Sequence, residues 1–256
     1  MVAFGREYSR YYDLLYKDKD YQKEVYYLRT LFEHFSSKRV KRIIDVACGT
    51  GNHAIPLAEQ GFTICGMDIS THMLNVARAK ARDLAIEHNL SFRHGDMRRY
   101  RPMGHFDACL CMFAALGYMP NHSQVLAALT SMRRHLRLGG LLIFDVWNGI
   151  AVITIKPSLR TKTIRANGII VKRTATPTLD VANSLCTVKY RLLVTDRNRT
   201  RKFSETHQMR YFYPDEIKLL LQLSGFDLLS LHPYLQPNRN LARRDWNMTA
   251  VARAVE

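Results

Sequence analysis

Short apolar runs alternate with amphipathic stripes along the first 147 residues of the chain. Each run has the length of a buried strand, and each stripe repeats at the three-to-four-residue spacing of a helix that packs on a sheet. The runs predict five strands, at 43–46, 62–68, 90–94, 106–113 and 141–147. This regular alternation predicts an α/β fold with a Rossmann-like parallel sheet and helices on both faces.

After residue 150 the pattern becomes the two-residue alternation of an antiparallel sheet, inserted after the fifth strand. Its expected strands are 163–166, 169–174, 184–194 and 202–212, with turns at Asn167-Gly168 and 196–198. A sheet inserted beyond the carboxyl edge of the main sheet is placed either to roof a pocket or to form a subunit interface.

The segments before the first strand and after the inserted sheet are expected to cover or complete the core. Residues 5–36 predict helices broken at 18–20, and their tyrosine-rich first part is either a lid over the site or a helix packed on the sheet. A helix over 214–223 precedes two last strands. The three expected parts are a helical lid with the core over 1–150, the inserted subdomain over 151–212, and the C-terminal completion of the core over 213–256.

A glycine-rich segment follows the first strand, in Ile43-Ile44-Asp45-Val46-Ala47-Cys48-Gly49-Thr50-Gly51-Asn52-His53. Gly49 and Gly51 suit a tight turn that lets the backbone approach a ligand, because a Cβ would hold it away. Asp45 lies inside an otherwise apolar strand, so its carboxylate calls for a cationic or hydrogen-bond-donating ligand. The Asp-x-x-x-Gly-x-Gly spacing resembles that of class I methyltransferases that use S-adenosylmethionine (SAM). This resemblance favours SAM over a nicotinamide cofactor.

Acidic residues also mark the ends of the next two predicted strands. Asp68 ends the second strand, where a carboxylate is placed to accept both ribose hydroxyls of an adenosine. In the methyltransferases that the loop resembles, a carboxylate at the position of Asp96 accepts from the adenine amino group, and the next residue, here Met97, covers the ring. The segment 112–118 leaves the carboxyl end of the fourth strand, where open α/β sheets bind their ligands.

The formal charge of +16 fits a nucleic-acid binder, an anionic substrate or a basic proteome. The cations are scattered over loops and helix ends, which is the usual place for solvated charge, so nucleic acid is not the favoured partner. An RNA or DNA methyltransferase, or a nucleic-acid-binding protein, remains the alternative, although the segment 112–115 lacks the aromatic-proline tetrad normal for nucleic-acid methyltransferases. A nicotinamide oxidoreductase is the third hypothesis, disfavoured by Asp45 and Gly95-Asp96-Met97.

No apolar run reaches the length of a membrane span, and residues 1–7 lack a signal-peptide core. We therefore expect a soluble, cytoplasmic protein without membrane contact. Cys109 and Cys111 are the one cysteine pair with metal-ligand spacing, but on a strand they would alternate faces. The five cysteines thus predict buried thiols and no metal site.

The chain resembles one branch of class I methyltransferases nearly end to end: the N,N-dimethyltransferases of nucleotide-linked amino deoxysugars of the desosamine and mycaminose type. The matching motifs include Tyr12-Asp13-Leu14, the Asp45 to Gly51 loop, Gly95-Asp96-Met97-Arg98, Gly117-Tyr118, Trp147, and Phe203-Ser204-Glu205 with His207. Glycine N-methyltransferase is similar more distantly. The resemblance implies SAM as cofactor, a small-molecule amine as acceptor and a homodimer. Where the family carries Glu-Pro-Trp, this chain has Asp145-Val146-Trp147.

Methyl transfer from a sulfonium is a one-step displacement that needs alignment and exclusion of water but no nucleophilic side chain. An amine must be neutral to attack, so a nearby base or hydrogen-bond acceptor would help. Tyr118 and His207 are the catalytic candidates, with His122 third and Asp145 as a carboxylate that orients the amine. In the competing interpretations, His207 is a structural histidine and Tyr118 only shapes the pocket.

The remaining candidates bind the cofactor or the acceptor. The expected cofactor residues are Tyr16, Asp45, Ala47, Gly49, Gly51, His53, Asp68, Ile69, Asp96, Met97, Met112 and Phe113. The expected acceptor residues are Tyr12, Trp147, Arg210 and Arg244. The two arginines would meet a substrate diphosphate, with solvated surface charge as the alternative for each. For Trp147 the alternatives are a pocket wall and the core.

Overall fold

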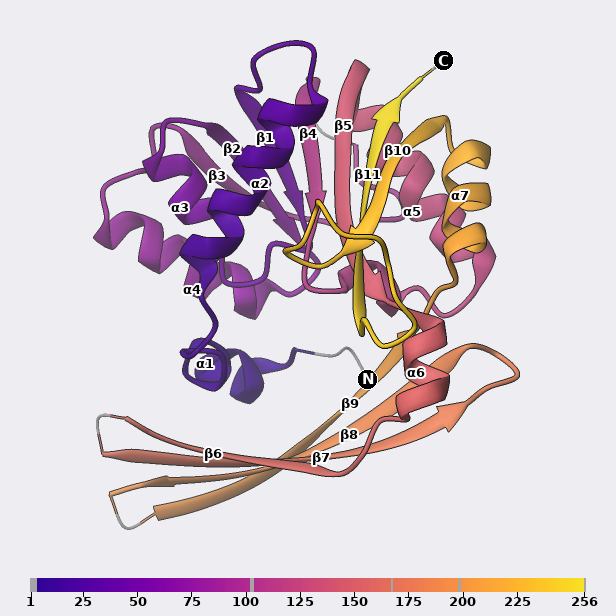
Figure 1. The fold of residues 1–256 in the computed structure, drawn as a ribbon. Coiled ribbons are helices and arrows are strands. Elements are labelled where there is room, and N and C mark those ends of the chain that lie inside the picture. The colour runs from indigo at the N-terminus through magenta and orange to yellow at the C-terminus, as the bar shows by residue number, and fades with distance from the viewer. Residues whose placement is uncertain (1–3, 102–103, 167, 198, 256) are drawn as a thin grey trace.

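The computed structural model describes residues 4–101, 104–166, 168–197 and 199–255. It contains a seven-stranded sheet in the order β10-β11-β5-β4-β1-β2-β3 and a four-stranded sheet in the order β6-β7-β8-β9 (Figure 1). The large sheet is parallel from β3 to β5, and β11 runs antiparallel to both β5 and β10. The expected fold class is confirmed. Within the described residues, no helix combines the length and apolar character needed to cross a membrane.

The large sheet and its helices form the core. Its strands are β1 (Arg42–Val46), β2 (Thr63–Asp68), β3 (Leu90–His94), β4 (Phe106–Cys111), β5 (Leu136–Trp147), β10 (Phe226–Pro233) and β11 (Asn247–Ala254). Its helices are α2 (Tyr21–Phe35), α3 (Ala54–Glu59), α4 (Thr71–Asp83), η1 (Ala115–Tyr118), α5 (His122–His135), α6 (Gly149–Ile155) and α7 (Pro214–Leu223).

Alternate residues of the strands pack into two separate layers, which is why the sheet is covered on both faces (Figure 1). On β1, Ile44 and Val46 face the layer of α5 and α7, while Ile43 faces the layer of α2, α3 and α4. The carboxyl ends of the parallel strands are left open between these layers. This edge faces the second sheet.

The second sheet is a meander of β6 (Arg160–Ala166), β7 (Ile169–Asp180), β8 (Leu185–Asp196) and β9 (Arg199–Arg210). It extends beyond the carboxyl edge of the core, and α1 (Arg6–Leu15) lies between the two sheets (Figure 1). Tyr8 and Leu15 of α1 pack with Met73 of α4 and with Val171 and Leu192 of the second sheet. The second sheet and α1 therefore cover the open edge of the core together.

The structure differs from the sequence prediction mainly at strand and helix ends. The fifth strand was expected at 141–147, but β5 begins at Leu136, directly after the end of α5 at His135, and Leu136 pairs with Phe106 of β4. Gly139 has a φ of +79°, and Gly139-Gly140 accommodates an irregularity inside this longer strand. The inserted strands are also longer than expected. Of the expected turns, Asn167 and Asn198 lie outside the described residues.

The short helix α6 was not expected from the sequence. The Asn148 side chain accepts a hydrogen bond from the Ile150 N–H and so caps its first turn. Asn148 also donates to the Asp245 carbonyl, which ties the start of α6 to the C-terminal loop. The missed element matters because it connects the fifth strand to the inserted sheet.

Candidate active site

A cavity of about 610 Å³ opens at the carboxyl ends of β1, β2 and β4, between the glycine-rich loop, α1 and the inserted sheet. This position is expected for an open α/β sheet, because the strand ends point their last side chains and loops there. The expected site residues that line it are Tyr12, Tyr16, Asp45, Ala47, Gly49, His53, Asp68, Ile69, Asp96, Met97, Met112, Phe113, Tyr118, Trp147 and His207. Most of the predicted constellation is thus brought together.

The glycine-rich loop uses backbone conformations that suit glycine. Gly49 has a φ of +57° and Gly51 a φ of +79°. Gly51 supports the loop rather than lining the cavity, since a Cβ there would lie 3.0 Å from the Phe92 ring. Ala47 also takes a positive φ, of 59°, which strains a residue with a Cβ. The loop that lines the cavity therefore contains a strained backbone conformation at Ala47.

Asp45 is a buried carboxylate without a hydrogen-bond partner on Oδ2. Its pKa is raised to about 7, chiefly by burial; His53 opposes the shift and the nearby Asp68 adds to it. An unpaired carboxylate at the wall of a cavity is costly unless a cation or a donor reaches it. Asp45 therefore fits a cationic ligand beside the glycine-rich loop.

Asp68 ends β2 with each carboxylate oxygen anchored by a backbone group. The Gly49 N–H donates to Oδ2 at 2.8 Å and the Ser70 N–H donates to Oδ1 at 2.7 Å. Burial raises the pKa of Asp68, and these two hydrogen bonds oppose the shift. Each oxygen keeps a second lone pair, so Asp68 can still accept hydrogen bonds from a ligand.

Asp96 is held by a neighbouring cation. Arg98 Nη2 lies 2.6 Å from its Oδ2, and Arg98 Nε lies 3.0 Å from its Oδ1. The hydrogen bonds from Arg98 lower the pKa of Asp96. Among the described residues that line the cavity, Arg98 is the one arginine or lysine, against the carboxylates of Asp45, Asp68 and Asp96. The cavity is thus acidic in a protein whose formal charge is +16.

His53, predicted to bind the cofactor, lines the cavity but has a partner of its own. Its Nε2 lies 2.7 Å from Glu24 Oε2, and Glu24 also pairs with Lys19. Burial acts to raise the pKa of Glu24, but the contacts with His53 and Lys19 lower it to about 2. This arrangement joins α2 to the start of α3 just behind the glycine-rich loop.

A strained turn follows β4. Phe113 and Ala114 both have positive φ, 65° and 56°, in a segment without glycine. Asp145 holds it, since its Oδ2 accepts from the Ala114 N–H at 3.1 Å and from Asn247 Nδ2 at 3.0 Å. Burial raises the pKa of Asp145. Asp145, expected to orient an amine in the main cavity, instead supports the turn and lines a neighbouring pocket.

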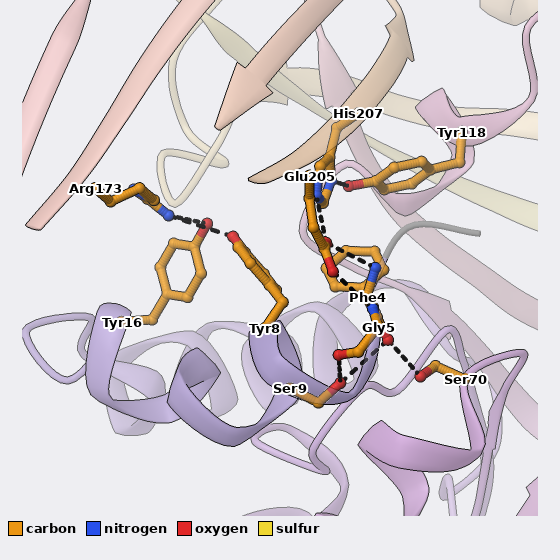
Figure 2. A network of polar contacts seen from close by, with 10 residues as sticks. All are labelled: Phe4, Gly5, Tyr8, Ser9, Tyr16, Ser70, Tyr118, Arg173, Glu205 and His207. Carbon is orange, nitrogen blue, oxygen red and sulfur yellow. Dashed lines mark hydrogen bonds and ion pairs between the residues drawn. The ribbon is translucent and has the colours of Figure 1, made fainter. Parts of the chain in front are cut away.

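Tyr118, His207 and Glu205 form a chain of hydrogen bonds across the roof of the cavity (Figure 2). Tyr118 Oη lies 2.6 Å from His207 Nδ1, and His207 Nε2 lies 3.1 Å from Glu205 Oε2. An ionised carboxylate accepts hydrogen bonds only, so Nε2 carries a proton and Nδ1 accepts from the Tyr118 hydroxyl. Burial raises the pKa of Tyr118 well above its usual value, which keeps the phenol neutral.

Glu205 also binds the start of the chain. Its two oxygens accept from the Phe4 N–H at 2.9 Å and the Gly5 N–H at 2.7 Å (Figure 2). At the other end of α1, Asp13 Oδ1 accepts from the Thr50 hydroxyl at 2.6 Å. The helix is therefore attached both to the inserted sheet and to the glycine-rich loop, and its tyrosines close one side of the cavity.

Two expected acceptor residues do not reach the cavity. Arg210 is buried and bonds to Glu216 Oε1 at 2.7 Å and to the Asn183 carbonyl at 3.3 Å, so its charge is already compensated. Arg244 is exposed in the loop before β11 and does not line the cavity. His122, the third catalytic candidate, contacts Glu216 at an exposed position.

Several cavity residues were missed from the sequence. They include Phe4, Tyr8, Asn52, Tyr190, Met209, Trp246 and Asn247. Glu205 lies two residues before His207 on β9, so the two-residue periodicity of a strand would have placed both on one face. Tyr190 lies on the same face of the sheet, because it pairs directly with Glu205 in the register of β8 with β9.

Comparison with known proteins identifies the relatives of this chain. A family model described as a methyltransferase domain matches residues 43–140. The dTDP-3-amino-3,6-dideoxy-alpha-D-glucopyranose N,N-dimethyltransferase of Streptomyces fradiae is 28% identical over 227 residues, 88% of this chain and 86% of the relative. A Bacillus subtilis protein named as a methyltransferase, YqeM, is 30% identical over 190 residues, 73% of this chain and 74% of its own.

Solved structures agree. A SAM-dependent methyltransferase from Clostridium acetobutylicum superposes with a TM-score of 0.83 at 18% identity, covering 98% of both chains. DesVI of Streptomyces venezuelae superposes with a TM-score of 0.79 at 23% identity, covering 96% of this chain and 99% of DesVI. These structures confirm the expected fold, and the methyltransferase family model together with the curated methyltransferase relatives bears out the expected cofactor, SAM. The chain belongs to the SAM-dependent methyltransferases.

Proposed function

We propose that the enzyme methylates the nitrogen of a small-molecule amine, and that this amine belongs to an amino sugar carried on a nucleotide. The observation that carries the proposal is the row of hydrogen bonds through Tyr118, His207 and Glu205, which ends at an acidic, aromatic cavity. Such a cavity suits a cationic cofactor together with an amine. The naming of two similar proteins as dTDP-amino-sugar N,N-dimethyltransferases supports the acceptor class.

The protein offers matching groups for three parts of SAM: the ammonium, the ribose and the adenine. Asp45 would meet the ammonium end, which supplies the cation that its bare carboxylate lacks. Asp68 would accept from the ribose hydroxyls, and Asp96 with Met97 would hold the adenine. SAM supplies an activated methyl group on a positively charged sulfur. The chain then has to align the amine, exclude water and remove one proton.

The roof of the cavity is suited to remove that proton. The Tyr118 hydroxyl donates to His207 Nδ1, so its oxygen can accept a hydrogen bond from the amine. The proton leaves the amine toward Tyr118 Oη as the phenolic proton moves to His207. Glu205 stabilises the resulting imidazolium from the Nε2 side. Tyr118 therefore acts at the amine, and Glu205 acts through His207 as a positioning residue.

The N-terminal segment is proposed as a lid. Glu205 binds its first turn through the Phe4 and Gly5 N–H groups, and Ser70 donates to the Phe4 carbonyl at 2.9 Å. The same carboxylate thus joins lid closure to the Tyr118–His207 pair. A lid excludes water from the transfer step.

Assembly as a homodimer stays a prediction.

A nucleic-acid acceptor has less support, because the cavity is acidic and a cluster of surface cations lies away from it. Lys172, Lys189, Arg191 and Lys202 line a depression of the inserted sheet that shares no residue with the main cavity. Successive side chains of a strand point to opposite faces of the sheet. These four cations therefore lie on the other face of the inserted sheet from Arg173, Tyr190 and Glu205.

Calorimetric titration tests the acceptor class. At saturating S-adenosylhomocysteine, we expect dTDP-3-amino-3,6-dideoxy-D-glucose to bind, and dTDP-6-deoxy-D-glucose, which has a hydroxyl in place of the amine, to bind about tenfold more weakly. Binding of S-adenosylhomocysteine without measurable binding of the amino sugar would contradict the proposed acceptor and leave the methyltransferase assignment intact.

A further inference from the structure

A second pocket, of about 390 Å³, lies beside the main cavity. The two share Phe113, Trp246 and Asn247 as common walls. Its other walls come from Lys19 after α1 and from Tyr234 in the loop after β10. A ligand in the main cavity therefore has a neighbouring space into which a further part of it can extend.

Two residues that line this pocket each carry a buried polar atom without a hydrogen-bond partner. These atoms are Asp145 Oδ1 and Tyr234 Oη. Asp145 is 1% exposed, and its other oxygen is fully engaged by the Ala114 N–H and Asn247. Leaving a buried polar atom unpaired is destabilising, so such atoms in native proteins commonly meet a ligand or ordered water. Two of them in one pocket point to a polar occupant.

The charges and rings of the walls define that occupant. A carboxylate oxygen accepts hydrogen bonds, so the group facing Asp145 must donate one. Lys19 is already paired with Glu24, and its Nζ lies 4.9 Å from the centre of the Phe113 ring and 5.8 Å from that of Tyr234. The pocket thus presents acidic and aromatic walls but no unpaired cation among its described residues. An anionic group such as a phosphate is disfavoured.

We infer that this second pocket is the subsite for the hydroxyl-bearing ring of the acceptor, next to the amine that receives the methyl group. Asp145 Oδ1 accepts from one ring hydroxyl and Tyr234 Oη bonds to another. Phe113 and Trp246 pack on the apolar edges of the ring. The inference rests on the proposed function, which it deepens by assigning the residues that recognise the acceptor's hydroxyl groups.

The variant Tyr234→Phe tests the subsite with little risk to folding, since the hydroxyl that it removes has no protein partner. We expect the Kd of dTDP-3-amino-3,6-dideoxy-D-glucose, measured at saturating S-adenosylhomocysteine, to rise about tenfold. The Kd of S-adenosylhomocysteine and the Tm of the protein without ligand should stay at their wild-type values.

Tyr211→Phe is the matched control, because Tyr211 Oη is also buried without a partner and lines none of the three pockets. It is expected to bind the amino sugar as the wild type does. An unchanged Kd in Tyr234→Phe would assign the second pocket to ordered water and overturn the subsite. An equal loss in both variants would also overturn it. Failure of the wild type to bind the amino sugar would instead overturn the proposed function, and the subsite with it.

Discussion

Replacing Asp45 by asparagine is expected to raise the Kd for SAM about 100-fold at pH 8. The side chain is buried at the end of β1, and no described residue bonds to its Oδ2. A cationic ligand would be the partner of this charge, and truncation of one member of a buried charge pair typically costs several kcal/mol. Asparagine has the same shape, so the fold of the glycine-rich loop should persist. Calorimetric titration with SAM measures the loss.

The pH dependence of binding gives this experiment a second readout. Since burial raises the pKa of Asp45 to about 7, the carboxyl is protonated below that pH and cannot attract a cation. In wild-type protein the SAM affinity should therefore fall as the pH drops below about 7 and level off above it. The Asp45→Asn variant should lose this dependence. A wild-type affinity independent of pH between 6 and 8 would contradict the role given to Asp45.

The raised pKa of Asp45 has the opposite effect on folding: without ligand, the stability of the protein falls as the pH rises. The folded pKa of Asp45 lies above the unfolded value near 3.9, so the folded state holds its proton more tightly. The associated stability is complete below the unfolded pKa and is lost as the pH rises toward the folded pKa of about 7. SAM binding would offset this loss.

The substitution Tyr118→Phe is expected to lower kcat about 100-fold at pH 7 while leaving the SAM affinity within about twofold. Phenylalanine keeps the ring and removes the hydroxyl that lies 2.6 Å from His207 Nδ1. The amine then lacks a route for its proton, and the defect should narrow at high pH, where the free amine is already abundant. Rates measured from pH 6 to 10 test both statements.

Tyr190→Phe is the matched control for this variant. The Tyr190 ring centre lies 5.0 Å from that of His207, and Tyr190 lines the same cavity, but the hydrogen-bond chain does not pass through its hydroxyl. We expect a much smaller loss of kcat. Equal losses of kcat in the two variants would show that turnover depends on hydroxyl groups around the cavity in general and not on Tyr118 in particular. Wild-type turnover in Tyr118→Phe would remove Tyr118 from the mechanism.

The parallel sheet and the glycine-rich loop could be predicted because their signals are local. The apolar runs of β1 to β4 each lie within one element and predict a buried strand. The glycines at 49 and 51 lie within one loop and predict a tight turn. Asp45 was recognised for the same reason, as a carboxylate within an apolar run. Cofactor candidates near strand ends accordingly line the cavity.

The roof of the cavity could not be assembled from local signals. Glu205 reaches Phe4 across 201 positions of the chain, and that contact depends on the register of β8 with β9 and on the path of α1. Arg210 looked like a phosphate ligand, but it lies where β9 returns to the core, and there Glu216 compensates its charge. Asp145 was expected to orient an amine, but its partners Ala114 and Asn247 come from distant segments that the local sequence does not reveal.

The measurement that tests the central claim most directly is the destination of the methyl group. The enzyme is incubated with dTDP-3-amino-3,6-dideoxy-D-glucose and SAM that carries an isotopic label in its methyl group, and the product is examined by NMR. We predict that the label appears on the amine nitrogen of the sugar. A label on a hydroxyl oxygen, or an unchanged sugar with intact SAM, would contradict the account.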